Sequence, residues 1–277
     1  MNMKSNLTAL IIARNEERML QACLETLSFC QKIIVLDTGS NDQTVKIAEN
    51  YNCQVISFTH ESFAKLREKA QSLVQTEWLL YIDADERVTP TLAREILLHI
   101  EKDDCQIMTM RRKNICYGSQ LNFGNWQNDL VTRVFKTTNL QGWRGEIHES
   151  PVYEGQEVKL KYELIHLTHR STQDNLRKSA DWTIKEARAL EAATVKKITL
   201  PFILRKGIME FYRRAFKYQG FKDGMPGLIE ALVQAINRMI VYIQVWELQQ
   251  KPSISTRYEK VDQEIKSLWK NEGKIVL

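Results

Sequence analysis

The first hundred residues alternate between short apolar runs and longer amphipathic ones, and this alternation constrains the fold more than any other feature. Apolar, largely β-branched runs that are typical of strands occupy residues 7–13, 32–37, 53–58 and 77–83. Runs with the apolar spacing of helices occupy residues 16–29, 42–50, 62–74 and 89–100. Strands that alternate with helices of this length are typical of βαβ units. We therefore expect an α/β fold with a mostly parallel sheet.

The remainder of the chain changes character twice. Residues 106–167 are rich in glycine and contain strand-like segments at 107–111, 130–135 and 158–167, which indicates a loop-rich region of mixed structure. From Thr172 the sequence is helical, with amphipathic segments at 175–194, 200–218 and 228–248. We expect one domain over residues 1–170 and a helical extension over residues 171–277.

Charge and cysteine content exclude several classes of protein. The 277 residues carry a formal net charge of +5, which permits an anionic substrate or membrane surface but is too small for a dedicated nucleic-acid binder. The five cysteines are odd in number and form no Cys-x-x-Cys pair, so we expect neither a disulfide framework nor a zinc ribbon. We find no signal peptide and no uncharged apolar stretch of about 20 residues, and we expect a cytoplasmic protein.

Acidic residues follow two of the predicted strands at the edge where parallel sheets bind their ligands. Asp37 ends the run at 32–37, and Gly39 after it permits a tight turn near a nucleotide base or ribose. Asp83 and Asp85 follow a buried strand, and paired carboxylates there favour a site for Mg²⁺ or Mn²⁺. The alternative is that these acids cap helices or are solvated, but their strand context favours the cation site. The loop that contains Asn15 lies at the same edge.

Three segments resemble a known family by their order and separation. IIARNEE, LDTGSNDQT and EWLLYIDADE are similar to the inverting glycosyltransferases of family 2, which have the GT-A fold. The later segments RVFK and WRGEIHE resemble a bacterial subgroup that includes lipopolysaccharide core β-glucosyltransferases, whose members also carry a helical tail with an equivalent of GFKDG. The resemblance implies transfer of a hexose, glucose in the subgroup, from a UDP-sugar to a lipopolysaccharide inner-core acceptor, with a divalent metal.

The resemblance also implies roles for individual residues of the donor site. Asn15 and Glu16 lie near the nucleotide base, and Asp37 binds the uridine. Arg67 matches a basic position near the nucleotide, although Glu68 follows it where the family often has Asn. Asp83 faces the ribose or the diphosphate, and the metal is held by Asp85 with Asp83.

The acceptor hydroxyl needs a general base. Glu146 and Glu149 are the candidates, and we favour Glu149 because the His-Glu pair recurs in the subgroup. His148 could bind the metal or the diphosphate. His166 and His169 are close in sequence, but we do not expect them to form a metal-binding pair.

Two aromatic and basic features have a structural alternative to a functional role. Trp126 and Trp143 could stack on sugars, but core packing would explain them equally. The segment 205–217 contains five basic residues and one acid among aromatic and apolar ones. Such a segment can lie on an anionic membrane, or it can be a solvated face of a packed helix.

Other functions share parts of this pattern. The acceptor could be a peptide or another cell-surface polymer, or the protein could bind a sugar nucleotide without catalysis. A nucleotidyltransferase also uses paired acids on a parallel sheet, but it would normally have a glycine-rich basic loop where this chain has Arg-Asn-Glu-Glu. We expect no nucleic-acid partner.

Overall fold

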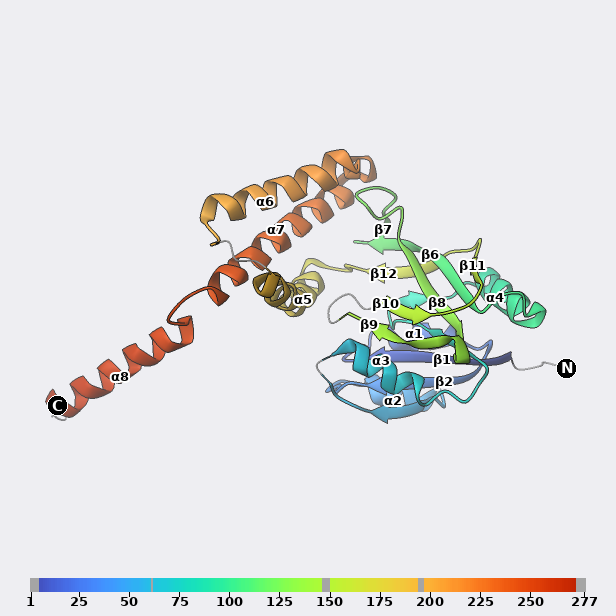
Figure 1. Cartoon of the computed structure of the whole chain (residues 1–277). Helices are drawn as coiled ribbons and strands as arrows, with labels where there is room; N and C mark the ends of the chain where they lie inside the picture. The colour runs from blue at the N-terminus through green and yellow to red at the C-terminus, as the bar shows by residue number, and fades with distance from the viewer. Residues whose placement is uncertain (1–4, 61, 146–149, 194–196, 273–277) are drawn as a thin grey trace. The chain divides into compact units, whose positions relative to one another are not determined.

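The computed structural model describes residues 5–60, 62–145, 150–193 and 197–272 (Figure 1). The chain divides into two compact units, Met1–Arg170 and Ser171–Leu277. Each unit buries its own set of apolar side chains.

The parallel part of the sheet in the first unit confirms the predicted alternation. Its strands lie in the order β3 (Gln54–Ser57), β2 (Cys30–Asp37), β1 (Ser5–Ala13) and β4 (Trp78–Tyr81). All three neighbouring pairs are parallel. All four residues of β4 are buried, as expected for a strand that is covered on both faces.

The second part of the sheet mixes directions. β8 (Leu130–Lys136) is antiparallel to both β4 and β6 (Ile107–Cys116), and β12 (Leu164–Thr168) is parallel to β6. The short β5 (Glu86–Arg87) pairs with β12, while β7 (Ser119–Gln120) and β11 (Glu157–Lys159) pair with β6. A separate antiparallel ribbon consists of β9 (Leu140–Arg144), which follows the 3-10 turn η1 (Thr137–Asn139), and β10 (Ser150–Tyr153).

The strand expected over residues 158–167 is two strands. β11 pairs with the start of β6 and β12 with its end, so the ten residues of β6 hold both in tandem. Between them the backbone N–H groups of Lys161 and Tyr162 leave the sheet and donate to the Glu95 carboxylate. The Glu95 carboxylate thus replaces a neighbouring strand as the hydrogen-bond acceptor for these two backbone N–H groups.

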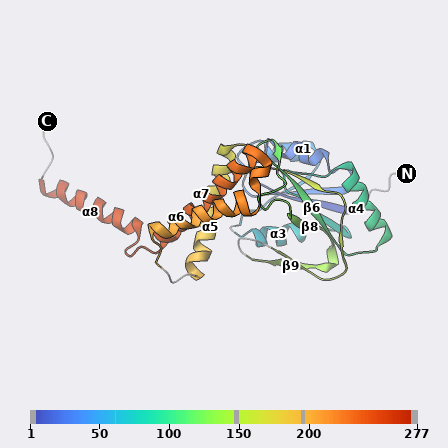
Figure 2. The ribbon, with the colours of Figure 1, turned by 90° about the horizontal axis from the view of Figure 1, so that it is seen from above.

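Helices cover one face of the sheet, and a helix with the ribbon covers the other (Figure 2). The first layer consists of α1 (Leu20–Glu25), α2 (Thr44–Asn50) and α4 (Pro90–Lys102). α3 (Phe63–Gln71) lies with β9 on the opposite face. The α4 helix begins as predicted, because the Thr89 hydroxyl accepts a hydrogen bond from the backbone of Leu92 and Pro90 opens the first turn.

The second unit is helical, as the sequence predicts. It contains α5 (Thr172–Ala193), α6 (Leu200–Tyr212), the π-helical η2 (Arg213–Lys217), the 3-10 helix η3 (Gly220–Asp223), α7 (Gly224–Leu248) and α8 (Ile254–Glu272). Ala187, Ile203 and Val241 are among the side chains buried between α5, α6 and α7. The segment expected as one helix over 200–218 therefore changes to π geometry at Arg213.

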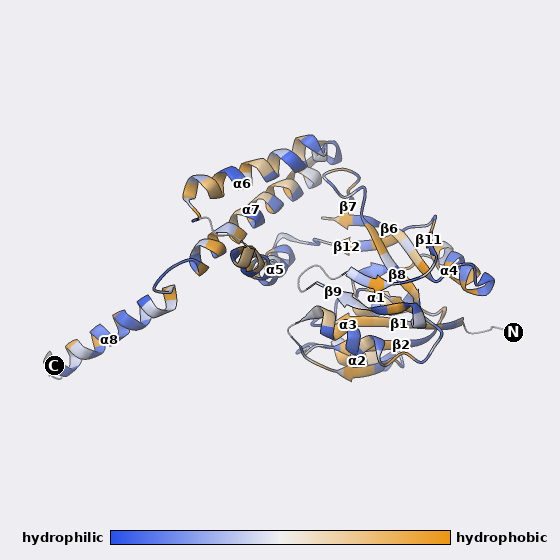
Figure 3. Ribbon diagram, in the orientation of Figure 1, coloured by the Kyte–Doolittle hydropathy of each residue, from blue (hydrophilic) through white to orange (hydrophobic). Residues whose placement is uncertain are grey.

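One helical segment, Gly220–Leu248, is long and apolar enough to cross a membrane by length and composition alone. In the structure 28% of its most apolar window is buried. Hydrophobic residues also recur along α6 (Figure 3). The expectation of a chain without a membrane-spanning segment stays a prediction.

Candidate functional site

The loops after β1 and β2, which the sequence assigns to the nucleotide, are tied to each other. The backbone N–H of Asn15 donates to the Ser40 hydroxyl at 3.0 Å, and the Asn15 side-chain oxygen accepts from the backbone of Asn41 at 2.8 Å. Asn15 adopts a left-handed backbone with φ of 55°, which asparagine tolerates better than most residues. The side chain of Asn15 thus holds the second loop in place.

Further contacts extend the connection toward α2. The backbone N–H of Glu16 donates to the Thr44 hydroxyl at 2.8 Å, and that of Glu17 donates to the Asp42 carboxylate at 3.1 Å. Burial alone would raise the pKa of Asp42, but hydrogen bonds from Thr44 and Glu17 hold it below its ordinary value. Residues 15–17 thus belong to the loop, and α1 begins at Leu20, later than the sequence predicts.

Asp37 is buried at the end of β2, with 4% of its surface exposed. Its carboxylate accepts hydrogen bonds from the backbone N–H groups of Gly39, at 3.2 Å, and Ser40, at 3.1 Å. Gly39 has a φ of +96°, so the turn requires glycine there. The aspartate therefore shapes the loop that the sequence assigns to the nucleotide.

Arg133 on β8 joins two acids that follow β4. Its guanidinium donates to Asp83 and to Glu86, each at 2.5 Å, and Glu86 also accepts from the backbone N–H of Asp83 at 3.0 Å. Arg133 is 6% exposed and Glu86 fully buried, whereas 39% of the Asp83 side chain is exposed. Asp83 is thus the member of this group that a ligand can reach.

The two acids respond to this environment in opposite ways. Burial would raise the pKa of Asp83, but the positive charges of Arg133 and Arg67 outweigh it and hold that pKa below its ordinary value. Burial dominates for Glu86 and raises its pKa despite Arg133. Asp83 is therefore the carboxylate that is ionised most readily.

Asp85 faces His166 of β12 across a short gap. The His166 Nε2 atom lies 3.7 Å from an Asp85 carboxylate oxygen, and the two side chains are 12% and 13% exposed. The backbone also ties this region together, because the N–H of Leu167 donates to the Asp85 carbonyl at 2.8 Å. Two ligand atoms at this separation can share one divalent cation.

A chain of side chains orients His166. Arg112 donates two hydrogen bonds to Asp129, at 2.8 and 2.9 Å, and Asn114 donates its amide to the same carboxylate at 2.9 Å. The Asn114 oxygen then lies 2.6 Å from His166 Nδ1. Because that oxygen can only accept, Nδ1 carries a hydrogen, and Nε2 is the ring nitrogen that faces Asp85. These atoms fit a site for Mg²⁺ or Mn²⁺.

Arg67 of α3 lies against two aromatic rings. The centre of its guanidinium is 4.5 Å from the Trp143 ring and 5.3 Å from the Tyr81 ring. Trp143 in turn packs edge-on against Tyr81 and Phe135. Trp143 therefore supports Arg67 near Asp83, a role that the sequence did not suggest.

The remaining predictions fall into two groups. Glu146, His148 and Glu149 lie outside the described residues, between the end of β9 and the start of β10. His166 and His169 have different surroundings, as His169 packs edge-on against Trp126 with ring centres 5.8 Å apart.

The sequence missed Glu86, Arg133 and the orientation of His166, although an arginine within the apolar run of β8 was a signal for a buried ion pair.

Comparisons with known proteins identify a family. A family model described as "Glycosyl transferase family 2" matches residues 8–169. "Lipopolysaccharide core biosynthesis glycosyltransferase LpsC" of Rhizobium meliloti (strain 1021) is 25% identical over 264 residues, which cover 91% of this chain and 97% of that protein. "Uncharacterized glycosyltransferase RC0292" of Rickettsia conorii is 23% identical over 94% of this chain and 97% of its own. The structure of S. aureus TarS 1-349 in complex with UDP is 14% identical, covers 87% of this chain and 90% of that chain, and has a TM-score of 0.45.

Proposed function

Because the chain belongs to glycosyl transferase family 2, we propose that it is an inverting enzyme that transfers a hexose, with glucose the first to test, from a UDP-sugar to the lipopolysaccharide inner core. Its curled, mostly parallel sheet with C-terminal helices fits the GT-A fold. The observation that carries the proposal is the Asp85–His166 pair, whose aspartate lies two residues after Asp83 in the segment between β4 and β5. Similarity to LpsC over most of the chain supports the choice of acceptor.

The donor nucleotide would bind at the joined loops. Asp37 and the loop of Asn15 and Glu16 would contact the uridine, and their mutual hydrogen bonds keep this surface in one conformation before the ligand arrives. Asp83, the most accessible acid near Arg133, would face the ribose or the diphosphate. Arg67 would add positive charge near the phosphates from its position on Trp143.

Asp85 and His166 would hold the divalent cation, with Asp83 and His148 as further ligands. When bound, Mg²⁺ or Mn²⁺ supplies positive charge that stabilises the leaving diphosphate. Asn114 keeps the His166 ring in the tautomer that can bind metal, and Asp129 with Arg112 holds Asn114.

The acceptor side needs a carboxylate that removes a proton from the attacking hydroxyl. We assign this role to Glu149, with Glu146 as the alternative. The hydroxyl oxygen then bonds to the anomeric carbon on the face opposite UDP, the bond to the diphosphate oxygen breaks, and the proton goes to the glutamate. A single displacement of this kind inverts the anomeric configuration.

Thermal unfolding with a set of donors tests the donor and the metal. We expect UDP-glucose or another UDP-sugar to raise the melting temperature when Mn²⁺ is present, because a ligand that binds only the folded state stabilises it. ADP- and GDP-sugars should have little effect. Asp85→Asn should abolish the metal-dependent part of the shift, and Asp262→Asn, an exposed acid of α8, is the matched control. A shift with ADP- or GDP-sugars alone would refute the donor assignment.

Release of UDP in the presence of acceptor tests the general base. Glu149→Gln should keep the UDP-sugar thermal shift and lose transfer, and Glu146→Gln should keep both. The reverse pattern would move the role to Glu146. Transfer that survives both substitutions would exclude this segment as the source of the base.

We also propose that the protein works in the cytoplasm at the inner face of the membrane, where a glycolipid acceptor lies. Leu204, Ile208, Tyr212 and Phe216 form an apolar stripe along α6 and η2, with 48%, 69%, 62% and 51% of their surfaces exposed. Basic residues flank the stripe at positions 205, 206, 213, 214 and 217. An apolar stripe with basic flanks suits an anionic lipid surface.

A further inference from the structure

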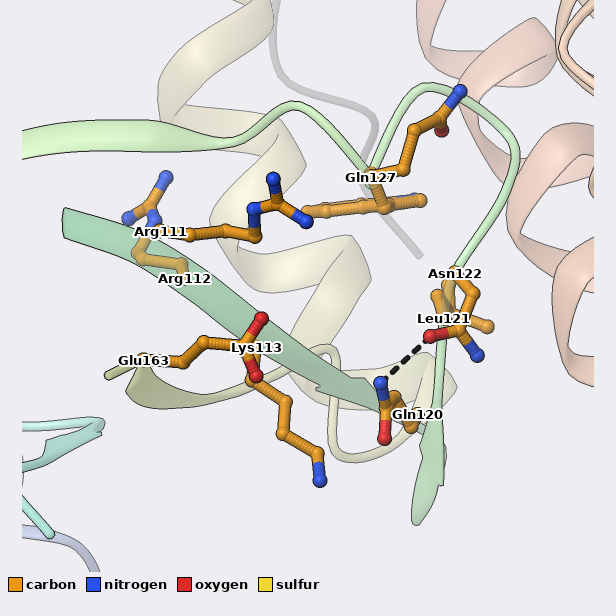
Figure 4. A pocket seen from close by; sticks show the side chains of 9 residues that line it. Arg111, Arg112, Lys113, Gln120, Leu121, Asn122, Gln127 and Glu163 are labelled. Carbon is orange, nitrogen blue, oxygen red and sulfur yellow. Dashed lines mark hydrogen bonds between the residues drawn. The ribbon is translucent and has the colours of Figure 1, made fainter. Parts of the chain in front are cut away.

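A cavity of about 200 Å³ lies beside β6 and β7 in the first unit (Figure 4). Its walls come from the middle of β6, from β7 and the loop that follows it, and from the residue before β12. Of the described residues assigned above to the nucleotide or the metal, none is among the residues that line it, and Arg112 links it to the chain of side chains that orients His166. The cavity therefore needs a separate explanation.

Cations dominate the charge of the cavity. β6 contributes Arg111, Arg112 and Lys113 in succession, and among the described residues of the wall Glu163 is the one acid. Arg112 is neutralised by Asp129, with which it makes two hydrogen bonds. Within the described ranges, Arg111 and Lys113 have no carboxylate oxygen within 4.0 Å of their charged nitrogens. The cavity thus has a positive excess suited to an oxyanion.

Two polar atoms in the cavity wall lack partners. Trp126 Nε1 and Gln127 Oε1 are buried and make no hydrogen bond to any residue that the structure describes. The first can only donate and the second can only accept. Neither atom reaches the surface of the cavity, so a ligand could use them only after the side chains rotate. A sugar hydroxyl suits such a pair because it both donates and accepts.

The cavity is connected to the proposed reaction centre. Arg112 of the cavity wall holds Asp129, which accepts from Asn114, and Asn114 orients His166 beside Asp85. We propose that the cavity binds a sugar of the acceptor that carries an oxyanion, either a phosphate or a carboxylate. This inference rests on the proposed function, because it assigns the acceptor to the side of the site opposite the nucleotide loops along the sheet.

Binding of small sugars tests the inference on the full-length protein with UDP and Mn²⁺ present, so that the donor site is occupied. The probes are glucose 6-phosphate, glucuronate and glucose, measured by saturation-transfer NMR and calorimetry. We expect at least one anionic sugar to bind about tenfold or more tightly than glucose, since a hydrogen bond to a charged group is worth that much. Preference for glucose 6-phosphate identifies a phosphate, and preference for glucuronate a carboxylate.

Substitutions in the cavity wall test whether the anionic sugar binds there. Arg111→Gln and Lys113→Gln should each weaken the anionic sugar by about tenfold, and Trp126→Phe should weaken it by removing the indole N–H while keeping a ring. Lys159→Gln, an exposed cation on β11, is the matched control and should have no effect. Equal binding of glucose, no binding of either anion at millimolar concentration, or unchanged binding in the Arg111 and Lys113 variants would overturn the inference.

The thermal shift caused by UDP and Mn²⁺ in the same samples separates the two proposals. If the shift is present and no anionic sugar binds, the inference about the cavity fails and the proposed donor site stands. If the shift is absent, the proposed function fails, and the sugar titrations repeated without UDP still decide whether the cavity binds an oxyanion.

Discussion

Arg133 is the cation on which two neighbouring acids of the site depend. It contacts both Asp83 and the fully buried Glu86. We expect Arg133→Leu to lower the free energy of unfolding by about 3–5 kcal/mol, because it removes the closer of the two cations that face the buried Glu86 carboxylate and leaves Arg112, 3.5 Å away, as its counterion. Urea unfolding measures this loss, and Arg94→Leu on the exposed side of α4 is the control. A loss below about 1 kcal/mol would mean that water or another cation replaces the guanidinium.

His166 gives the sharpest test of the metal site. We expect His166→Ala to weaken Mn²⁺ binding by about tenfold or more. Even the loss of a residue that only orients a metal ligand typically lowers metal affinity about 10–100-fold. His169→Ala is a matched control, since His169 packs on Trp126 and does not face Asp85. Calorimetry with Mn²⁺ and UDP measures the difference. Equal Mn²⁺ affinity in the two variants would exclude His166 as a ligand.

Asp129 links stability to pH. Burial favours its neutral form, but hydrogen bonds from Arg112 and Asn114 outweigh burial and hold its pKa below the ordinary 3.8. Since the folded pKa is the lower one, Asp129 stabilises the fold fully above its unfolded pKa, and this stabilisation is lost as the pH falls through the folded value. We expect the stability difference between wild type and Asp129→Asn to shrink from about pH 5 to about pH 3. A difference that is constant over this range in urea unfolding would contradict the ion pair.

Sequence reasoning could place some of these residues and not others. Asp37, Asp83 and Asp85 could be predicted because each follows a recognisable strand, and strand ends meet at one edge of a parallel sheet. The contact between His166 and Asp85 could not be predicted, because it depends on the pairing of β12 with β5 and β6. The same holds for Arg133, which reaches Asp83 only because β8 enters the sheet antiparallel beside β4.

At the level of helices and strands, Gly227 of α7 packs where no side chain fits. A Cβ atom there would lie 2.1 Å from the backbone carbonyl oxygen of Gly220. We expect Gly227→Ala to cost about 1–3 kcal/mol or more, because η3 and α7 must separate to admit the methyl group. Gly207→Ala should cost less, since its Cβ would meet only the side chain of Met239. Thermal unfolding compares them, and equal melting temperatures would contradict the packing.

The helical region shows what periodicity can and cannot predict. The amphipathic pattern predicted α6 and α7, because an apolar face is visible at helical spacing. It did not predict the change to π geometry at Arg213. There Arg213 and Arg214 both donate to Glu210, which lies one turn earlier, at 2.5 and 2.7 Å. The spacing of apolar residues does not reveal these two ion pairs.

For the whole molecule, the proposed contact with a membrane can be tested with vesicles. We expect the protein to sediment with vesicles that contain phosphatidylglycerol and much less with phosphatidylcholine alone, because basic residues flank the apolar stripe of α6 and η2. Ile208→Ser with Tyr212→Ser should reduce sedimentation severalfold. Val261→Ser with Leu268→Ser is the control, since α8 also exposes apolar residues but contains four basic and four acidic ones. An equal reduction by the two pairs would contradict a specific role for α6.

The pairing of Asp85 with His166 also bears on the order in which the chain folds. The nucleotide loops belong to β1 and β2, which are neighbours in the chain and in the sheet. His166 meets Asp85 only after β12 has paired with β6 and with β5, and the pairing with β5 joins residues as far apart in the chain as Arg87 and Ile165. Contacts between distant residues form slowly because the loop that joins them must first close. A refolding chain should therefore gain affinity for nucleotide before affinity for metal, and the appearance of metal binding would time the last step of sheet assembly.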